Sequence, residues 1–299
     1  MPAIRHGAAA VVDVEIDSIA ADPVREFSFS AADFQTLSRL AYDYAGIALS
    51  DSKRNLVYSR LSRRLRALHL ASFRDYCDYL ADNSPELENF INSISTNHTK
   101  FFREAHHFDH LRSHVAIPFA QAAARKPGGR LRIWSAGCSS GEEPYTIALV
   151  LKREIRDFSG HDVRILATDI DTDVLTKAAQ GEFAGSAIDE VPEQYRSLFQ
   201  HKTNGSTTEK VRVDKELQSL IAFRRLNLMD TWPFKGLFDA IFCRNVMIYF
   251  DGPTKENLVE RFRQQLKPGG WLYIGHSESL IGAHPGLELL GRTTYRRVG

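Results

Sequence analysis

A turn rich in glycine and serine, residues 135–145 (SAGCSSGEEPY), runs into a pair of carboxylates, Glu142 and Glu143. Small residues let a ligand lie against the backbone where a strand turns into a helix. A dinucleotide would need G-x-G-x-x-G and bare helix N–H groups facing its pyrophosphate, whereas carboxylates in that place repel phosphate. The turn therefore suits a ligand that carries positive charge and hydroxyl groups. Alternatively, the two glutamates only favour the helix dipole, with Pro144 starting the helix.

Other polar residues follow further apolar segments of the chain. Asp169 comes after residues 163–168 and is placed to accept hydrogen bonds from both hydroxyls of a ribose, although by itself it would equally serve as a helix cap. Asn227 and Asn245 each follow a later apolar segment, and an asparagine amide can pair with a donor and an acceptor on an adenine edge. Because ligands in open α/β sheets bind beyond the carboxyl ends of the strands, these positions are candidate binding residues.

The elements that must position these residues begin after Arg130. Apolar segments of strand length alternate there with helical ones, at residues 131–135, 163–168, 238–243 and 271–275. This alternation is typical of a doubly wound α/β fold, a mostly parallel sheet with helices on both faces. Residues 182 to about 225 break the alternation, with Gly205 to Thr208 between segments that could pair as a hairpin. We expect a small β insertion there.

The preceding part of the chain has a different, helical character. Ser30 and Asp33 predict a capping box, with Phe29 and Phe34 as a hydrophobic staple, and Gly46 ends the helix that they start. Apolar residues continue to recur at helical spacing up to about residue 96. We therefore predict a mobile tail at residues 1–26, an all-helical domain at 27–96, a linker at 97–130 that contributes to the binding site, and the sheet domain at 131–299.

Composition excludes several classes of protein. Of the 299 residues, 43% are hydrophobic and 25% charged, which is typical of globular proteins rather than of disordered or collagen-like chains. No apolar run approaches the roughly 18 residues that span a bilayer. The net charge of +1 does not suggest a nucleic-acid partner. Three widely spaced cysteines, Cys77, Cys138 and Cys243, fit neither a disulfide framework nor a metal site, so a reducing cytoplasm is expected.

Several short strings are similar to those of one known family. They are NHTKFFRE (97–104), GEEPY (141–145), TDID (168–171), FCRNVMIYF (242–250) and GHSE (275–278). In this order they resemble the chemotaxis receptor methyltransferases, CheR, from about residue 27 to 297. The resemblance implies a Rossmann-like class I methyltransferase fold. It also implies S-adenosylmethionine as methyl donor, S-adenosylhomocysteine as product, and glutamate side chains of chemoreceptor cytoplasmic helices as acceptors.

The resemblance also implies roles for individual residues. In the linker, Asn97, Thr99 and Arg103 would close over the cofactor. Glu143 and Asp169 would hold its amino-acid and ribose portions. Four residues would complete the pocket: Asn227, Leu228, Arg244 and Asn245. The protein would work in the cytoplasm at membrane-bound receptor arrays without inserting into the membrane, and in some family members the β-subdomain at 182–225 grips a peptide at the receptor C-terminus.

Methyl transfer from a sulfonium to a carboxylate turns a cation and an anion into neutral groups. A dry, aligned pocket therefore favours it. A glutamate with a pKa of about 4.3 is already ionised at pH 7, so no general base is needed. The site needs groups that orient the carboxylate, and the candidates are Arg103, through its fork of donors, and Tyr249, through its hydroxyl. Tyr249 would alternatively pack in the core beside Phe250.

A basic stretch suggests a docking surface for the substrate. No acid interrupts residues 53–66, where Lys53, Arg60 and Arg64 share one stripe of a predicted helix. Such a stripe is usually a solvated face. The alternative hypothesis is that it docks the acidic methylation helices of a receptor, because opposite charge speeds encounter and fixes register.

Three other interpretations compete with this one. Residues 137–141 match G-x-S-x-G, so Ser139 could be a hydrolase nucleophile with Asp239 and His276 as partners, but the segment before Leu131 lacks the strands that usually precede such a turn. A non-catalytic receptor-binding protein on a methyltransferase fold is the second. A nucleic-acid methyltransferase is the third.

Histidines at helical spacing resemble a metal-binding face but lack a cysteine partner, so no metal is expected. They are His106, His107, His110 and His114.

Overall fold

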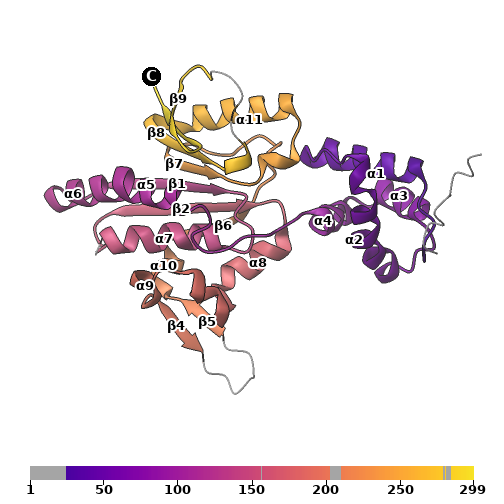
Figure 1. The fold of residues 1–299 in the computed structure, drawn as a ribbon, viewed down its shortest axis with the longest axis horizontal. Helices are drawn as coiled ribbons and strands as arrows, with labels where there is room; N and C mark the ends of the chain where they lie inside the picture. Colours follow the sequence, from indigo (N-terminus) through magenta and orange to yellow (C-terminus); the bar gives the residue numbers. More distant parts are fainter. Residues whose placement is uncertain (1–24, 156, 203–209, 279, 281–283) are drawn as a thin grey trace, which may run out of the picture.

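The computed structural model describes residues 25–155, 157–202, 210–278, 280 and 284–299. They form a helical domain beside a larger α/β domain, here called the sheet domain, from which a small second sheet projects (Figure 1). Most of the predicted mobile tail lies outside the described residues. Its last two residues contact the helical domain, where Arg25 donates to Asn55 (2.8 Å) and Glu26 pairs with Arg66.

The helical domain follows local signals in the sequence. Its helices are α1 (Ala31–Ala45), α2 (Arg54–Ala67), α3 (Phe73–Asp82) and α4 (Ser84–Ile94), with a 3₁₀ turn at Asp51–Lys53. The predicted capping box is present, since the Ser30 side chain accepts from the Asp33 N–H and Asp33 accepts from the Ser30 N–H. The rings of Phe29 and Phe34 meet edge to face at 6.2 Å. Gly46 ends α1 with a φ of 70°, in the left-handed region that glycine favours.

The main sheet has seven strands, and five of them are parallel. The strands are β1 (Arg130–Ala136), β2 (Asp162–Asp169), β6 (Ile221–Arg225), β7 (Phe238–Cys243), β8 (Leu266–Ile274), β9 (Leu287–Gly291) and β10 (Thr294–Arg297). Their order is β6-β2-β1-β7-β8-β10-β9, and β10 runs antiparallel to both of its neighbours. The predicted doubly wound, mostly parallel sheet is thus confirmed.

Helices cover both faces of this sheet (Figure 1). Neighbouring residues of β1 point to opposite faces, so Ile133 packs with Ile147 of α7 (Glu142–Glu154), whereas Trp134 packs with Phe262 of α11 (Gly252–Gln265). The remaining helices of the domain core are α5 (His106–Leu111), a π-helical turn (Arg112–Ala116), α6 (Ile117–Arg125) and α8 (Thr172–Gln180). Much of the predicted linker at 97–130 therefore consists of helices packed on the sheet domain.

The predicted β insertion is present as a small sheet. Its strands β3 (Glu182–Ala184), β4 (Phe199–Lys202) and β5 (Lys210–Val213) pair antiparallel in the order β3-β5-β4. Short helices accompany it: a 3₁₀ helix (Gly185–Glu190), α9 (Glu193–Arg196) and α10 (Lys215–Ser219). The predicted end at about 225 is too late, because residues 221–225 form β6 and pair with β2 in the main sheet. The predicted turn at 205–208 lies outside the described residues.

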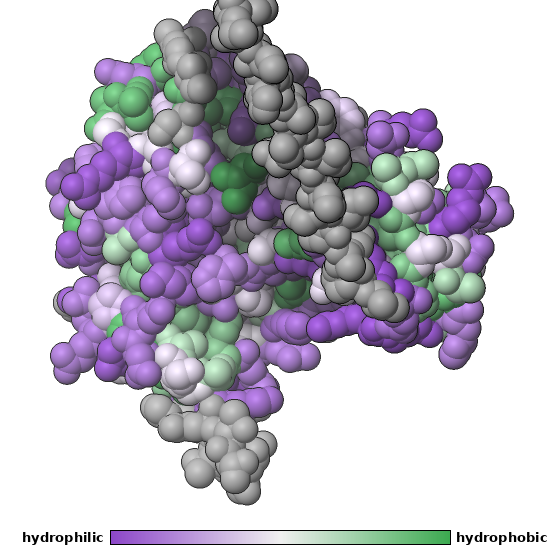
Figure 2. All heavy atoms as spheres, turned by 45° about the vertical axis from the view of Figure 1, so that its right-hand side comes forward, coloured by the Kyte–Doolittle hydropathy of each residue, from purple (hydrophilic) through white to green (hydrophobic). Residues whose placement is uncertain are grey.

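The surface is predominantly polar. On the face drawn in Figure 2, hydrophilic residues prevail and hydrophobic ones form small, scattered patches. Within the described part of the chain, none of the helices has the length and apolar character needed to cross a bilayer.

Candidate active site

A cavity of about 340 Å³ opens between the carboxyl ends of the parallel strands and the helical domain. Its walls come from the turns that follow β1, β2, β6 and β7, from residues 94–103, and from the helical domain. It is lined by every residue predicted to bind cofactor or substrate carboxylate, and by one residue of the predicted docking stripe: Asn97, Thr99, Arg103, Glu143, Asp169, Asn227, Leu228, Arg244, Asn245, Tyr249 and Lys53. The fold therefore brings together motifs that lie up to about 150 residues apart in the sequence.

Asp169 lies at the end of β2 and is 8% exposed. One carboxylate oxygen accepts from the Ser139 N–H (2.8 Å) and the other from the Asp171 N–H (3.0 Å). A carboxylate has about four lone-pair sites, so each oxygen can still accept from a ligand hydroxyl. Burial raises the pKa of Asp169 to about 6. With this pKa most of the carboxyl is ionised at pH 7.

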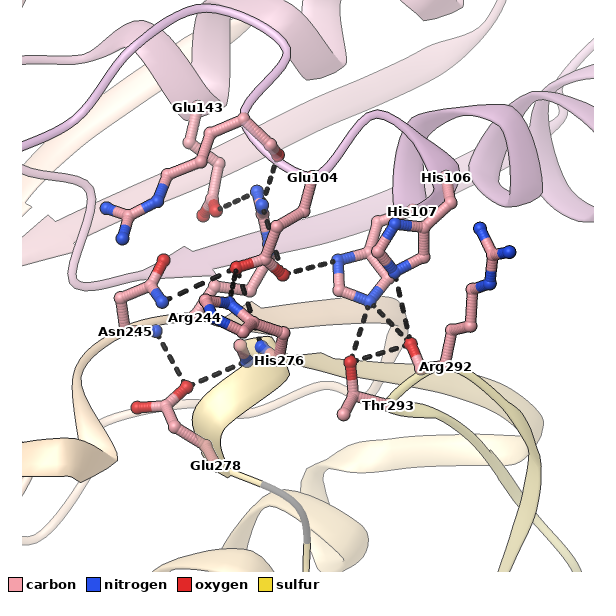
Figure 3. A network of polar contacts seen from close by, with 12 residues as sticks. Glu104, His106, His107, Glu143, Arg244, Asn245, His276, Glu278, Arg292 and Thr293 are labelled. Atoms are coloured by element: carbon pink, nitrogen blue, oxygen red, sulfur yellow. Dashed lines mark hydrogen bonds and ion pairs between the residues drawn. The ribbon is translucent and has the colours of Figure 1, made fainter.

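Glu143 and Arg244 form a buried ion pair on the cavity wall. The Arg244 Nη1 lies 3.0 Å from Glu143 Oε2, and the Ser135 hydroxyl donates to Glu143 Oε1 (2.7 Å). Burial raises the pKa of Glu143, and the Arg244 charge opposes that rise. Arg244 also donates to the Arg103 carbonyl, and its Nη2 lies 3.5 Å from Glu104 (Figure 3). Arg244 thus ties the turn after β7 to β1, to α7 and to residues 103–104.

Hydrogen bonds hold residues 97–103, the segment before α5, in place beside the cavity. The Asn97 amide donates to Asp171 (2.6 Å), the Ser139 hydroxyl donates to the Asn97 carbonyl (3.1 Å), and the Arg103 guanidinium donates to the His98 carbonyl (2.8 Å). Phe102 and Glu104 on either side of Arg103 have φ values of 53° and 57°. Non-glycine residues persist in this region only where their surroundings hold them, and such residues concentrate at functional sites.

Aromatic side chains fasten the same segment to the small sheet. Phe101 meets the rings of Phe183 (4.8 Å) and Phe199 (5.4 Å) edge to face, and Phe102 stacks on Tyr195 (4.9 Å). The neighbouring Lys100 lies 3.2 Å from Glu190. The small sheet therefore supports the segment that carries Arg103.

Both predicted asparagines line the cavity, and the side chain of each has a partner within the protein. Asn227 lines the cavity, but its amide donates to the Tyr44 carbonyl (2.6 Å) and its side-chain oxygen accepts from the Met229 N–H (3.0 Å). The turn after β6 and the end of α1 use this amide, so it would pair with an adenine edge only by exchanging these bonds. Asn245 has a φ of 60°, and its amide lies 3.5 Å from Glu104.

Tyr249 ends the short 3₁₀ helix Met247–Tyr249 and lies half-buried at the cavity. Its hydroxyl donates to the Thr96 carbonyl (3.4 Å), a long bond that an incoming acceptor can replace. Its carbonyl accepts from the Ala48 N–H of the helical domain (2.9 Å). The ring also packs against the core cluster that contains Phe250, as the alternative interpretation expected, while the hydroxyl lies at the junction of the two domains.

Two members of the predicted docking stripe are bonded within the helical domain. Arg64 forms a two-pronged bridge to the buried Glu86, with bonds of 2.9 and 2.6 Å. Arg60 donates to carbonyls at the end of α4 and to Thr96 (2.9 Å). Both guanidiniums therefore serve the helical domain itself, and only Lys53 of the three is exposed beside the cavity.

The geometry does not support a serine hydrolase. The Ser139 hydroxyl donates to the Asn97 carbonyl, Asp239 bonds the Arg132 N–H and Lys267, and His276 contacts Glu104 instead. These three residues therefore form no catalytic triad, and the hydrolase interpretation fails.

The histidine face lies against the sheet domain to different depths: His107 is buried, His106 and His110 are half-buried, and His114 is exposed. The Nδ1 of His110 lies 3.0 Å from the Tyr273 hydroxyl, and its ring stacks on His114 at 3.9 Å. Burial lowers the pKa of His107 to about 3 and that of His110 to about 4, so both are neutral at pH 7. Ligand atoms of Glu104, His106 and His107 lie within 4.8 Å of one another. The Arg244 guanidinium beside Glu104 disfavours a further cation there.

Some residues of the site escaped the sequence prediction. Glu104, His276 and Glu278 join the turns around the cavity (Figure 3), and Ile47, Leu49 and Leu56 form its wall on the side of the helical domain. Glu104 and the GHSE string were visible as family motifs, but their contacts depend on segments far apart in the chain. The apolar wall had no local signal beyond ordinary helical periodicity.

Comparison with known proteins finds one family along most of the chain. Residues 97–296 match the family model described as CheR methyltransferase, SAM binding domain, and residues 32–95 match CheR methyltransferase, all-alpha domain. A probable chemotaxis protein methyltransferase of Rhizobium etli is 45% identical over 260 residues, 86% of this chain and 96% of that protein. The chemotaxis protein methyltransferase of Escherichia coli is 43% identical over 272 residues, 90% of this chain and 91% of its own. Among solved structures, the DhpI–SAH complex is a remote likeness, with a TM-score of 0.30 and 16% identity over 65% of this chain and 71% of that one.

Proposed function

The chain belongs to the CheR family of chemotaxis protein methyltransferases, and we propose that the cavity between its two domains is where a methyl group passes from S-adenosylmethionine to chemoreceptor glutamates. The products are glutamate methyl esters and S-adenosylhomocysteine, and the reaction serves sensory adaptation in chemotaxis. The observation that carries this conclusion is the family match over most of the chain, with the motif residues gathered on one cavity.

The donor set of the cavity fits this cofactor. Asp169 offers ionised oxygens to ribose hydroxyls, and Glu143 offers negative charge toward an ammonium or sulfonium group. Leu228 and Ile47 supply apolar wall for an adenine ring. We assign the nine predicted cofactor residues to this pocket, with Asn227 and Arg244 acting by holding its walls: Asn97, Thr99, Arg103, Glu143, Asp169, Asn227, Leu228, Arg244 and Asn245.

When bound, S-adenosylmethionine supplies a methyl group on a positively charged sulfur. The acceptor glutamate needs no base, because it is ionised at pH 7 with a pKa of about 4.3. The work of the chain is to exclude water and to align the acceptor. Leu49 and Leu56 of the helical domain line the cavity on the side opposite the sheet, where they offer an apolar surface to a bound substrate.

Arg103 and Tyr249 are the proposed catalytic residues. They belong to different segments, and both line the cavity, where a carboxylate would meet a guanidinium and a phenolic hydroxyl. The Arg103 guanidinium bonds only a backbone carbonyl among the contacts described, so it can turn toward an incoming carboxylate. The Tyr249 hydroxyl can exchange its long bond to Thr96 for a substrate oxygen.

We propose two surface features as contacts for the receptor. Lys53 stands exposed at the cavity mouth, where it can attract an acidic receptor helix. The small sheet has β3 and β4 as its outer strands, and an extended receptor C-terminal peptide can add to such an edge. Such contacts would recruit the enzyme in the cytoplasm to membrane-bound receptor arrays.

Calorimetric titration with S-adenosylmethionine and S-adenosylhomocysteine tests the pocket. The unaltered protein is expected to bind both. Asp169→Ala removes an acceptor for two hydroxyls, so its affinity should fall by at least about 100-fold. No binding to the unaltered protein, or equal binding to the variant, would overturn the assignment of this pocket.

A further inference from the structure

We infer that Glu278 is a positioning residue for methyl transfer, because its buried carboxylate holds the turn that carries Asn245 and Tyr249 to the cavity. The inference rests on the function proposed above and goes beyond it. Glu278 ends the short 3₁₀ helix His276–Glu278 that follows β8, and it is absent from the cavity lining. It therefore acts on the reaction only through the turn it holds.

The carboxylate of Glu278 gathers backbone donors from two separate turns (Figure 3). Oε2 accepts from the Asn245 N–H (2.7 Å) and the Gly275 N–H (2.7 Å), and Oε1 accepts from the Ile248 N–H (3.0 Å). The residue is only 6% exposed. One anion thus joins the end of β8 to the turn after β7.

The turn after β7 depends on this acceptor. Asn245 lies two residues after the end of β7 and adopts a φ of 60°, in the left-handed region that non-glycine residues rarely occupy. A partly buried N–H that loses its acceptor destabilises the turn that carries it. A glutamine has only one acceptor oxygen, so it would present its own N–H₂ group to one set of these donors. Only a carboxylate of this length serves all three donors.

The glycine of the same motif makes room for the carboxylate. A Cβ at Gly275 would lie 2.6 Å from Glu278 Oε2 and 2.9 Å from the Asn245 backbone nitrogen. Between the two, His276 reaches Glu104 with a 3.0 Å contact, and Glu104 lies beside Arg244. The GHSE string thus links the turn bearing Tyr249 to the segment bearing Arg103.

The geometry separates this role from cofactor binding at the ribose. Asp169 is held by Ser139 and Asp171, and neither contacts Glu278 among the contacts described. A shift of the turn would displace Tyr249 while leaving the Asp169 site in place. Misplacing a reacting group by about 1 Å can cost about 100-fold in rate. Loss of the carboxylate should thus lower kcat far more than it weakens S-adenosylhomocysteine binding.

The test is a double-mutant cycle in the full chain, measured with a receptor cytoplasmic fragment. Glu278→Gln, Tyr249→Phe and the double variant are compared for kcat, for KM of the receptor, for S-adenosylhomocysteine affinity and for melting temperature. We expect Glu278→Gln to lower kcat by about 10- to 100-fold with a smaller loss of cofactor affinity, because Asn245 of the same turn lines the cofactor pocket while Asp169 stays in place. Because both residues act through one turn, the double variant should lose no more than the worse single variant.

Glu86→Gln is the matched control. Glu86 is as buried as Glu278, at 5% against 6%, and it accepts hydrogen bonds within the helical domain away from the cavity. It should lose stability without loss of kcat. A Glu278→Gln variant that keeps the kcat of the unaltered protein, or losses that add in the double variant, would overturn the inference.

Gly275→Ala is the second variant, for the case in which Glu278→Gln does not fold. It keeps the carboxylate but pushes it from its donors, so it should show the same fall in kcat; unchanged kcat would overturn the inference. The unaltered protein measured in parallel separates the two claims. Absence of any methyl transfer by it would refute the proposed function, and with it the inference.

Discussion

The carboxyl of Asp169 lies in a buried site that disfavours its ionised form. Its usual pKa is 3.8, and burial raises the value to about 6 in the folded protein. The carboxyl is therefore protonated below about pH 6 and ionised above it. Because ionisation is harder when folded, this group by itself favours the folded state as pH falls through that range. A bound ribose would favour the ionised form again.

This shift predicts a pH dependence of cofactor affinity. If only the ionised carboxyl binds, about one tenth of the molecules are competent at pH 5, so the Kd for S-adenosylhomocysteine should be about tenfold weaker than at pH 7. Titration calorimetry from pH 5 to 8 measures it. Asp169→Asn should give a weak and flat profile, and a flat profile for the unaltered protein would contradict the account.

Arg64 illustrates a residue whose type was visible in the sequence but whose partner was not. Its bridge to Glu86 predicts that Arg64→Ala leaves a buried, uncompensated carboxylate and lowers the free energy of unfolding by about 2 to 3 kcal/mol. Arg63, exposed on the same helix, is the control. Arg63→Ala should change stability by less than about 0.5 kcal/mol. Equal urea-unfolding curves for the two variants would show that the bridge contributes nothing.

At the scale of elements, the segment at 97–104 depends on the small sheet beneath it. Phe199→Leu in β4 removes an edge-to-face contact with Phe101 worth about 0.5 to 1.5 kcal/mol. Because this segment carries Arg103, the variant should bind S-adenosylhomocysteine up to about tenfold more weakly and melt earlier. Calorimetry and thermal unfolding measure both.

Phe238→Leu in β7 is the control for that variant. Phe238 is similarly buried and packs on Trp134 and Phe234, away from the segment at 97–104. It should lower the melting temperature without changing cofactor affinity. Equal affinities for the two variants would mean that the small sheet does not support the pocket.

Elements with local signals were predictable from the sequence, and those that depend on distant pairing were not. The capping box at Ser30 and the apolar run before Asp169 are encoded within a few residues, so α1 and β2 stand as expected. Strand β6 was assigned to the insertion because only its pairing with β2 shows that it belongs to the main sheet. The same holds for the side chain of Asn227, whose partner Tyr44 is in the other domain.

At the scale of the molecule, the helical domain forms one wall of the cavity. Arg225 pairs with Glu88 (2.9 Å) and bonds the Tyr44 hydroxyl (2.6 Å), and Tyr42 donates to Asp251 (2.8 Å), so polar contacts hold the domains together around the cavity. Motif order in the sequence predicted the pocket residues of the sheet domain. It could not predict the opposite wall, because that wall exists only once the domains meet.

We propose above that methyl transfer to receptor glutamates takes place in this cavity. The most direct measurement is incubation of the full chain with methyl-labelled S-adenosylmethionine and a chemoreceptor cytoplasmic fragment, followed by peptide mass spectrometry. We expect base-labile methyl esters on glutamate side chains, and their loss in Asp169→Ala. Methyl groups on another residue type, transfer that survives Asp169→Ala, or no transfer by a protein that binds the cofactor would contradict it.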